Sequence, residues 1–197
     1  TAEALSADGW LRTGDIGVID PDGALTITDR KKDLIVTSNG KNVAPQTLEG
    51  MLKQSPFVAH AVVYGDNKKH LVALLTLDAP AILRWAREHD RPGDLAQLSR
   101  DPGVRTLISL DVAAVNRRLA QFETIKRFVL LDRDLSEELG ELTPTMKVRR
   151  RAVYDRHRAL QRRARIDEVE QAEDRRRQDQ RDPGAERFFE QPKQHAA

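Results

Sequence analysis

The sequence predicts a small α+β domain in which a mixed or antiparallel sheet is flanked by helices. Runs of β-prone residues alternate along the chain with segments whose apolar residues recur every three or four positions. The clearest strands, about residues 58–64 and 71–77, are separated by a Gly-Asp-Asn turn signal. Strands that alternate with helices, with hairpins among them, are typical of the α+β class.

A β-hairpin is predicted near the start of the chain. Ile16 to Ile19 and Ala24 to Thr28 are short β-prone runs joined through Asp-Pro-Asp-Gly. Pro presets φ early in that turn, and Gly permits the positive φ that closes it. A charged run, Asp29 to Asp33, precedes a further β-prone stretch, Leu34 to Thr37, and Asn39-Gly40 signals the next turn.

Helices are predicted from Pro45 onward, because Pro45 fits the first position of a helix with an apolar face. Helical patterning returns at Ala81 to Glu88, where Trp85 is interpreted as a packing residue, and again from about Val104. The apolar residues of that last helix recur at three- and four-residue steps: Val104, Leu107, Ile108, Val112, Val115, Leu119 and Phe122. Phe128 to Leu131 is predicted to be another strand.

Composition excludes several classes of function. Hydrophobic residues make up 39% of the 197 residues, below the usual ~45–50%, so part of the chain is expected outside any core. The 33 Lys and Arg nearly balance the 31 Asp and Glu, which disfavours nucleic-acid binding through bulk charge. The lack of Cys excludes disulfides, thiol nucleophiles and thiolate metal sites, and the five His show no metal-ligand spacing. No apolar run approaches the ~20 residues of a membrane helix, so a cytoplasmic location is expected.

The composition shifts from Arg151 onward, where Arg, Asp, Glu and Gln dominate. This pattern predicts a charged helix that leaves the domain and frays after about Arg181, since Pro183-Gly184 ends any helix. Arginines interleaved with acidic residues are typical of a solvated helix with ion pairs four residues apart. Docking of this tail on anionic membrane lipid, as a peripheral contact, or on another subunit is the alternative.

Three segments stand out as motifs: Gly9 to Asp15 (GWLRTGD), Asp29 to Asp33 (DRKKD) and Leu142 to Lys147 (LTPTMK). Taken singly, they have ordinary explanations as a turn, a solvated charge run and an exposed lysine. In this order, together with Asn39 to Pro45 (NGKNVAP), they resemble the C-terminal portion of the adenylate-forming (ANL) enzymes. That superfamily includes acyl-CoA synthetases, peptide-synthetase adenylation domains and beetle luciferase. The DRKKDLI and LTPTMK versions are most similar to those of long-chain fatty-acid–CoA ligases.

The resemblance, which covers about residues 9–153, implies a two-step ligation. A fatty-acid carboxylate attacks the α-phosphate of ATP to give acyl-AMP and pyrophosphate, and the thiol of CoA then displaces AMP. ATP, CoA and Mg²⁺ are therefore the expected cofactors, with Mg²⁺ bound mainly by a large N-terminal domain. The implied organisation is the end of that domain (1–30), a mobile C-terminal lid domain (31–153) and a charged helix with a frayed tail (154–197). Without a phosphate loop and an acyl pocket, the chain is expected to fold but not to catalyse alone.

Three residues match family positions that contact the reacting groups. Asp15 matches the carboxylate that binds the ribose hydroxyls, for which two acceptor oxygens suit two neighbouring donors. Arg30 matches a second nucleotide contact, where a planar cation engages ribose or phosphate oxygens. Lys147 matches the lysine that enters the active site during adenylation and stabilises charge that builds on the α-phosphoryl group. Here Met146 precedes that lysine, whereas Gly is commoner in the superfamily.

Two further residues match positions with conformational roles. Lys32 lies at the hinge about which the small domain rotates between its two orientations. Gly40 lies in the loop that approaches the pantetheine arm of CoA, where a Cβ would obstruct the tunnel, although the turn alone would also require glycine.

Other functions remain open from the sequence. A fatty-acyl-AMP ligase or a carrier-protein-directed adenylation domain would share these motifs and differ in the acyl acceptor. A basic α+β module for nucleic acid or acidic proteins would use the Arg-rich tail, but balanced charge and the lack of interleaved aromatics argue against it. A scaffold with a coiled tail would need apolar heptads, which are absent beyond Val169.

Overall fold

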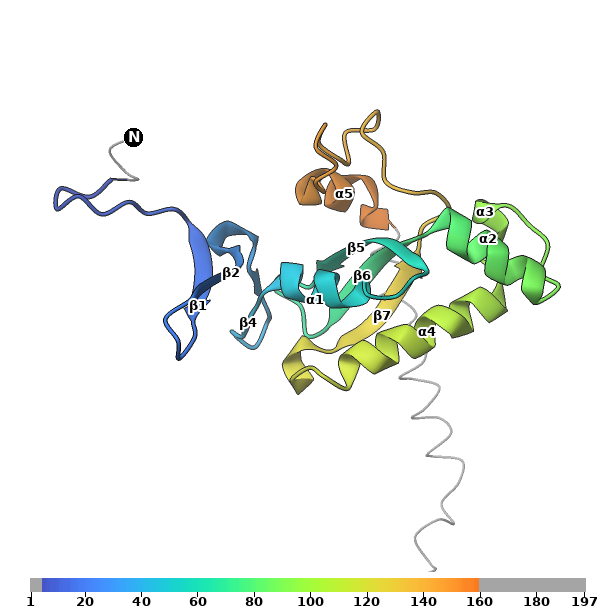
Figure 1. Ribbon diagram of the computed structural model, residues 1–197, viewed down its shortest axis with the longest axis horizontal. Helices are drawn as coiled ribbons and strands as arrows, with labels where there is room; N and C mark the ends of the chain where they lie inside the picture. Colours follow the sequence, from blue (N-terminus) through green and yellow to red (C-terminus); the bar gives the residue numbers. More distant parts are fainter. Residues whose placement is uncertain (1–4, 160–197) are drawn as a thin grey trace, which may run out of the picture.

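A three-stranded sheet with the order β5-β6-β7 lies between two layers of helix and loop, and a separate β-hairpin precedes it (Figure 1). The structure is a computed structural model that describes residues 5–159. Both the mixed sheet and its flanking helices confirm the predicted α+β class. The charged helix and frayed tail predicted beyond residue 159 lie outside the described residues.

The sheet combines antiparallel and parallel pairing. β5 (Val58–Tyr64) pairs antiparallel with β6 (Leu71–Leu77), and β6 pairs parallel with β7 (Ile125–Leu130). Parallel neighbours need a long crossover, and this one holds α2 (Ala79–Glu88), α3 (Leu95–Leu98) and α4 (Pro102–Asn116). The first two strands coincide with their predicted ranges, because turn residues bound each apolar run.

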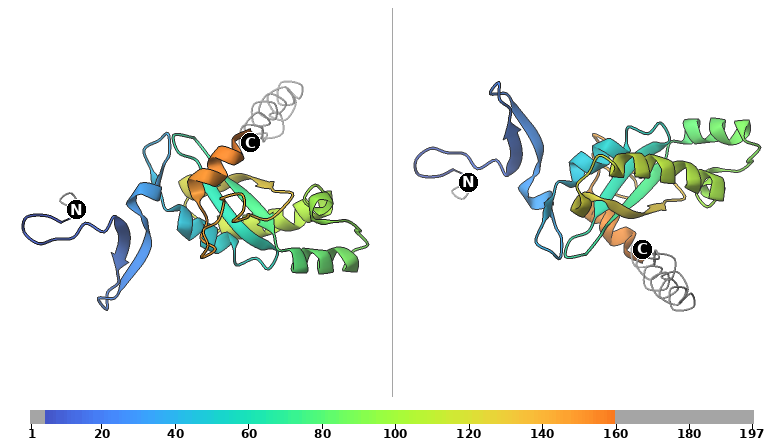
Figure 2. Two further views of the ribbon diagram at one scale, coloured as in Figure 1. Left: turned by 90° about the horizontal axis from the view of Figure 1, so that it is seen from above. Right: turned by 90° about the horizontal axis from the view of Figure 1, so that it is seen from below.

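The two faces of the sheet carry separate cores, since successive side chains of a strand point to opposite faces. Val63 and Ala73 belong to a large cluster beneath α1 (Pro45–Leu52) and α4. Val62 and Leu74 belong to a smaller cluster, which is closed by α5 (Arg150–Arg156) and the segment 131–148. Figure 2 shows α5 in front of the sheet from one side and α4 in front of it from the other.

α4 differs from its prediction at both ends. It begins at Pro102 because the Asp101 carboxylate accepts hydrogen bonds from the amides of Gly103 and Val104, 2.7 and 3.0 Å away. It ends at Asn116, whose side-chain amide bonds both the N–H and the C=O of Ile125 at 2.8 Å and starts β7. Phe122 therefore lies beyond the helix and is 43% exposed.

The helices of the crossover are otherwise ordinary amphipathic elements. Trp85 packs at the edge of the larger core and stacks on His89 with ring centroids 4.3 Å apart, which confirms its interpretation as a packing residue. At 15 residues, α4 is the longest helix in the described part of the chain. None of the helices described here has the length and hydropathy to cross a bilayer.

The prediction that a helix leaves the domain from Arg151 is wrong for the described residues. α5 starts at Arg150 and packs on the sheet, with Val153 fully buried. The Tyr154 hydroxyl donates a hydrogen bond to the carbonyl of Val63, 2.6 Å away. The sparse apolar pattern concealed this packing because α5 adds only Val153 and Tyr154 to the smaller core, and the segment 131–148 covers the rest. The domain boundary at 153/154 itself stays a prediction.

Candidate functional site

The β-hairpin brings together the two residues predicted to contact a nucleotide. β1 (Asp15–Ile19) pairs antiparallel with β2 (Leu25–Arg30), and Asp15 stands opposite Arg30 in the register. The Arg30 Nε atom lies 3.2 Å from Asp15 Oδ1. Both side chains are reachable from solvent, 56% exposed for Arg30 and 27% for Asp15. The Arg30 guanidinium, a hydrogen-bond donor, and the Asp15 carboxylate, an acceptor, thus lie side by side.

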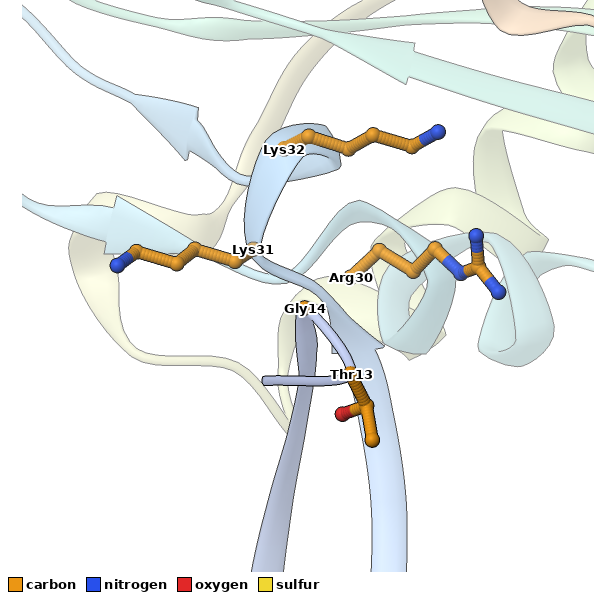
Figure 3. A pocket seen from close by; sticks show the side chains of 5 residues that line it. All are labelled: Thr13, Gly14, Arg30, Lys31 and Lys32. Carbon is orange, nitrogen blue, oxygen red and sulfur yellow. The ribbon is translucent and has the colours of Figure 1, made fainter. Parts of the chain in front are cut away.

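A hollow of about 380 Å³ opens at this end of the hairpin (Figure 3). It is lined by Thr13, Gly14, Arg30, Lys31 and Lys32. Lys31 donates its backbone N–H to the carbonyl of Gly14 at 2.8 Å, which joins the segment before β1 to the segment after β2. Three cations and no carboxylate line the hollow, so it suits an anionic ligand. Lys32 belongs to the 3₁₀ turn Lys31–Asp33, directly after β2.

Asp29 is a buried carboxylate that the sequence interpretation missed. It is 1% exposed, and its Oδ1 accepts a hydrogen bond from the Arg30 amide at 2.6 Å. Its Oδ2 accepts one from the amide of Gln46 at 3.1 Å, in the first turn of α1. The residue before that helix, Ala44, offers no side-chain cap. The lack of a capping side chain at Ala44 is the signal in the sequence that the first amides of α1 need an acceptor from elsewhere in the chain.

Gly40 lies in the turn between β3 (Ile35–Val36) and β4 (Asn42–Val43). Its φ is +71°, and its amide donates to the carbonyl of Thr37 at 2.9 Å. A Cβ at this position would meet no atom within 4 Å among the described residues. Backbone conformation alone therefore accounts for glycine here, and the role beside a CoA tunnel stays a prediction.

Lys147 lies on a tight turn that closes over residues 143–147, after which Val148 bridges to Leu142. The Thr143 amide donates to the carbonyl of Lys147 at 2.8 Å, and Thr143 Oγ1 accepts from the Lys147 amide at 3.0 Å. The Lys147 side chain is exposed and does not line the hollow. In Figure 1 the orange segment that carries this lysine turn lies beside α5, away from the hairpin. The structure thus brings Asp15, Arg30 and Lys32 together and leaves Lys147 apart.

Met146 holds a positive φ of +59° in the lysine turn and is 61% exposed. Left-handed backbone costs an L-residue roughly 1 kcal/mol that glycine does not incur. We expect Met146→Gly to raise the free energy of unfolding by about 0.5–1 kcal/mol, measured by urea denaturation. Met146→Ala keeps the Cβ and serves as the matched control, with no gain expected. A Gly variant no more stable than the Ala variant contradicts the strain at this position.

Two ion-pair clusters hold the segments on either side of the lysine turn. On one side the Glu141 carboxylate is fully buried and accepts two bonds from Arg133, at 2.7 and 2.9 Å. His157 Nε2 lies 2.9 Å from it, and the Ser136 amide donates to it at 3.2 Å. Burial raises the pKa of Glu141, but these hydrogen bonds outweigh burial and lower the pKa to about 2.

On the other side Arg150 pairs with Glu49 of α1 through both guanidinium Nη atoms, one of them 2.8 Å from Oε2. The Val63 amide donates to Glu49 Oε1 at 2.7 Å. Burial opposes the charged form of Arg150, but the bonds and charge of Glu49 outweigh it and raise the pKa of the guanidinium. Arg150 stands in a run of three arginines, and the sequence does not show which of them pairs with Glu49. The pair was therefore missed.

The described residues hold no cluster of metal-ligating side chains. Within 5–159, no group of three or more His, Asp or Glu side chains is placed to hold a metal ion.

Comparison with known proteins finds relatives of this chain. Residues 32–162 match the family described as the AMP-binding enzyme C-terminal domain. The chain is 43% identical over 158 residues to the long-chain-fatty-acid–CoA ligase FadD15 of Mycobacterium tuberculosis, which covers 79% of this chain and 26% of that protein. It is 37% identical over 153 residues to human long-chain-fatty-acid–CoA ligase 1, covering 76% and 22%. It thus spans about a quarter of the length of these curated relatives.

A solved structure shares the fold. The A domain of carboxylic acid reductase from Segniliparus rugosus, in complex with AMP and a co-purified carboxylic acid, superimposes with a TM-score of 0.67. The match covers 85% of this chain and 25% of that one at 23% identity, a likeness of architecture alone.

Proposed function

Because the chain belongs to the family of AMP-binding enzyme C-terminal domains, we propose that it is the mobile lid of a long-chain fatty-acid–CoA ligase. In this proposal the complete protein converts a fatty acid, ATP and CoA into acyl-CoA, AMP and pyrophosphate through an acyl-adenylate. Its own large N-terminal domain is the partner of this chain, and the protein is cytoplasmic. The observation that carries the proposal is the Asp15–Arg30 pair at the rim of a cationic hollow, in a chain homologous to such ligases.

The hairpin supplies the nucleotide contacts. Asp15 has two acceptor oxygens for the two ribose hydroxyls, and Arg30, 3.2 Å away, keeps that carboxylate oriented before the nucleotide arrives. Arg30, Lys31 and Lys32 lower the electrostatic cost of bringing phosphate to the hollow. These residues therefore bind and orient the nucleotide and take no part in bond making.

Removing the charge of Asp15 is expected to weaken ATP binding while leaving the fold intact. A hydrogen bond to a charged group contributes about 1.5–3 kcal/mol, so Asp15→Asn should raise the KM for ATP by roughly 10- to 100-fold. The pair with Arg30 is partly exposed, so its loss changes stability little. Pyrophosphate exchange in the complete protein measures the KM. Asp22→Asn, on the exposed tip of the same hairpin, is the control, and an equal effect there contradicts the assignment.

Lys147 needs a movement to reach the nucleotide, because its turn does not line the hollow. In the proposed cycle the lid rotates about Lys32, where a few backbone torsions of the 3₁₀ turn Lys31–Asp33 absorb the change. One orientation brings the ammonium of Lys147 to the α-phosphoryl group, and the other brings the Gly40 turn to the thiol donor. The lid thereby serves both half-reactions with one binding site for the nucleotide.

A chimera tests this function directly. The segment of the Mycobacterium tuberculosis ligase that matches this chain is replaced by the chain itself. We expect the chimera to form acyl-CoA from a long-chain fatty acid, ATP and CoA, whereas the truncated ligase and the isolated chain form none.

The identity of the acyl acceptor, CoA or a carrier protein, distinguishes the alternative functions in the same assay. Acyl-adenylate that accumulates without acyl-CoA, and is consumed by a carrier protein, favours a fatty-acyl-AMP ligase or a carrier-directed adenylation domain. A folded, soluble chimera that releases no pyrophosphate contradicts the proposal. Acyl-CoA formation by the isolated chain would contradict its role as a lid.

A further inference from the structure

The junction between the hairpin and the sheet domain contains one buried charge. Most of the hairpin is exposed, including Val18, Ile19 and Leu25, which are 60–70% exposed. Asp29, at the end of β2, is by contrast 1% exposed and faces α1, which packs against β2. A buried carboxylate is costly unless it is hydrogen-bonded, so its position at this junction requires hydrogen-bond partners.

Those partners lie on opposite sides of the proposed hinge residue Lys32. The Arg30 amide, 2.6 Å from Oδ1, precedes it, and the Gln46 amide, 3.1 Å from Oδ2, follows it. The first bond fixes the backbone of Arg30, and thus the direction from which its side chain meets Asp15. The second satisfies the positive N-terminal end of α1 in place of a local cap.

The effect of this contact extends to the lysine turn. α1 carries Glu49, whose carboxylate holds Arg150, and Arg150 follows Lys147 by three residues. The orientation of α1 relative to the hairpin therefore sets where the lysine turn lies relative to the nucleotide hollow. A rotation at Lys32 moves Gln46 relative to Asp29, because the two residues lie on different sides of the moving bonds.

We propose that Asp29 is a positioning residue of the hinge. Its carboxylate holds Arg30 and the first turn of α1 in the arrangement seen here and releases Gln46 when the sheet domain rotates. The rotation itself rests on the proposed function, whereas the holding contact does not. A residue that only capped α1 would stabilise the whole domain, but a positioning residue restrains the hinge selectively, and this difference is measurable.

Limited trypsin digestion of the 197-residue chain tests the restraint. Arg30, Lys31 and Lys32 are exposed and form a natural cleavage site, and Lys69, on the exposed turn between β5 and β6, is an internal reference. We expect Asp29→Ala to speed cleavage after residues 30–32 by about tenfold, the factor expected from loss of a helix cap, with cleavage after Lys69 unchanged. Asp29→Asn keeps one acceptor oxygen and should give an intermediate rate.

Asp22→Ala removes an exposed charge from the same hairpin and should cleave like the wild type. An unchanged rate after residues 30–32 in Asp29→Ala overturns the proposal. So does an equal increase at Lys69, since that would report loss of the fold as a whole.

The complete protein provides the functional readout. Pyrophosphate exchange measures adenylation, and transfer from added acyl-adenylate to CoA measures the second step. We expect Asp29→Asn to change the ratio of the two rates by at least about fivefold, because it alters the balance between orientations. Equal losses in both steps overturn the positioning role. A wild-type protein with neither activity would refute the proposed function and leave the digestion result standing.

Discussion

Replacing Lys147 with alanine is expected to slow acyl-adenylate formation in the complete protein by about 10²- to 10³-fold. Charge builds on the α-phosphoryl group as the fatty-acid carboxylate attacks it, so a positioned ammonium stabilises the transition state more than the bound substrates. The effect should fall on kcat rather than on the KM for ATP. Pyrophosphate exchange at saturating ATP is the measurement.

The second half-reaction separates this role from a structural one. Transfer of the acyl group from added acyl-adenylate to CoA should keep its wild-type rate in Lys147→Ala, because in the proposed cycle the lysine turn serves only the adenylating orientation. The side chain is exposed, so the thermal midpoint should not move. Lys53→Ala, which removes an exposed lysine at the end of α1, is the matched control. Equal exchange rates for Lys147→Ala and Lys53→Ala would make Lys147 an ordinary surface residue.

Glu141→Gln is expected to lower the free energy of unfolding at pH 7 by about 3 kcal/mol. The pKa of the carboxyl falls from 4.5 to about 2 on folding, and each unit corresponds to about 1.4 kcal/mol. Glutamine keeps one acceptor oxygen but loses the charge and the second oxygen that Arg133 and His157 share. For a chain of this size the thermal midpoint should fall by roughly 6–12 °C.

The sign of the pH dependence follows from the lowered pKa. Between pH 4.5 and about 2 the unfolded chain binds a proton at Glu141 that the folded chain does not, so stability is lost as the pH falls through this window. The difference between wild type and Glu141→Gln should therefore shrink from pH 5 to pH 2. Urea unfolding across this range measures it, with the exposed Glu138→Gln as control. A difference that stays constant would be incompatible with a carboxylate held ionised by its partners.

The sequence predicts most of the sheet because its signals there are local. β5 and β6 are apolar runs bounded by turn residues, and the first position of α1 is set by Pro45. The end of α4 was not predictable in this way. It depends on the pairing of the Asn116 side chain with Ile125, a contact that exists only once β7 is in place.

In the candidate site, too, residues in local motifs were predicted, and residues that depend on distant contacts were not. Asp15 and Arg30 are found from their motifs, and the antiparallel register of the hairpin explains why they meet. Asp29 and Glu141 look like solvated charges in sequence. Their burial is set by partners elsewhere in the fold, such as Gln46 and His157. Whether a charge is solvated or buried is decided by such distant partners, which composition and spacing do not reveal.

The anchoring of α5 also bears on how this domain behaves at high concentration. β5 lies at the edge of the sheet, and a strand edge with open peptide groups invites pairing with another copy. At Val63 these groups are already engaged, the N–H by Glu49 and the carbonyl by Tyr154. Glu49 and Tyr154 thus block strand pairing at this point of the edge, so changes that release them from Val63 are expected to favour association between copies.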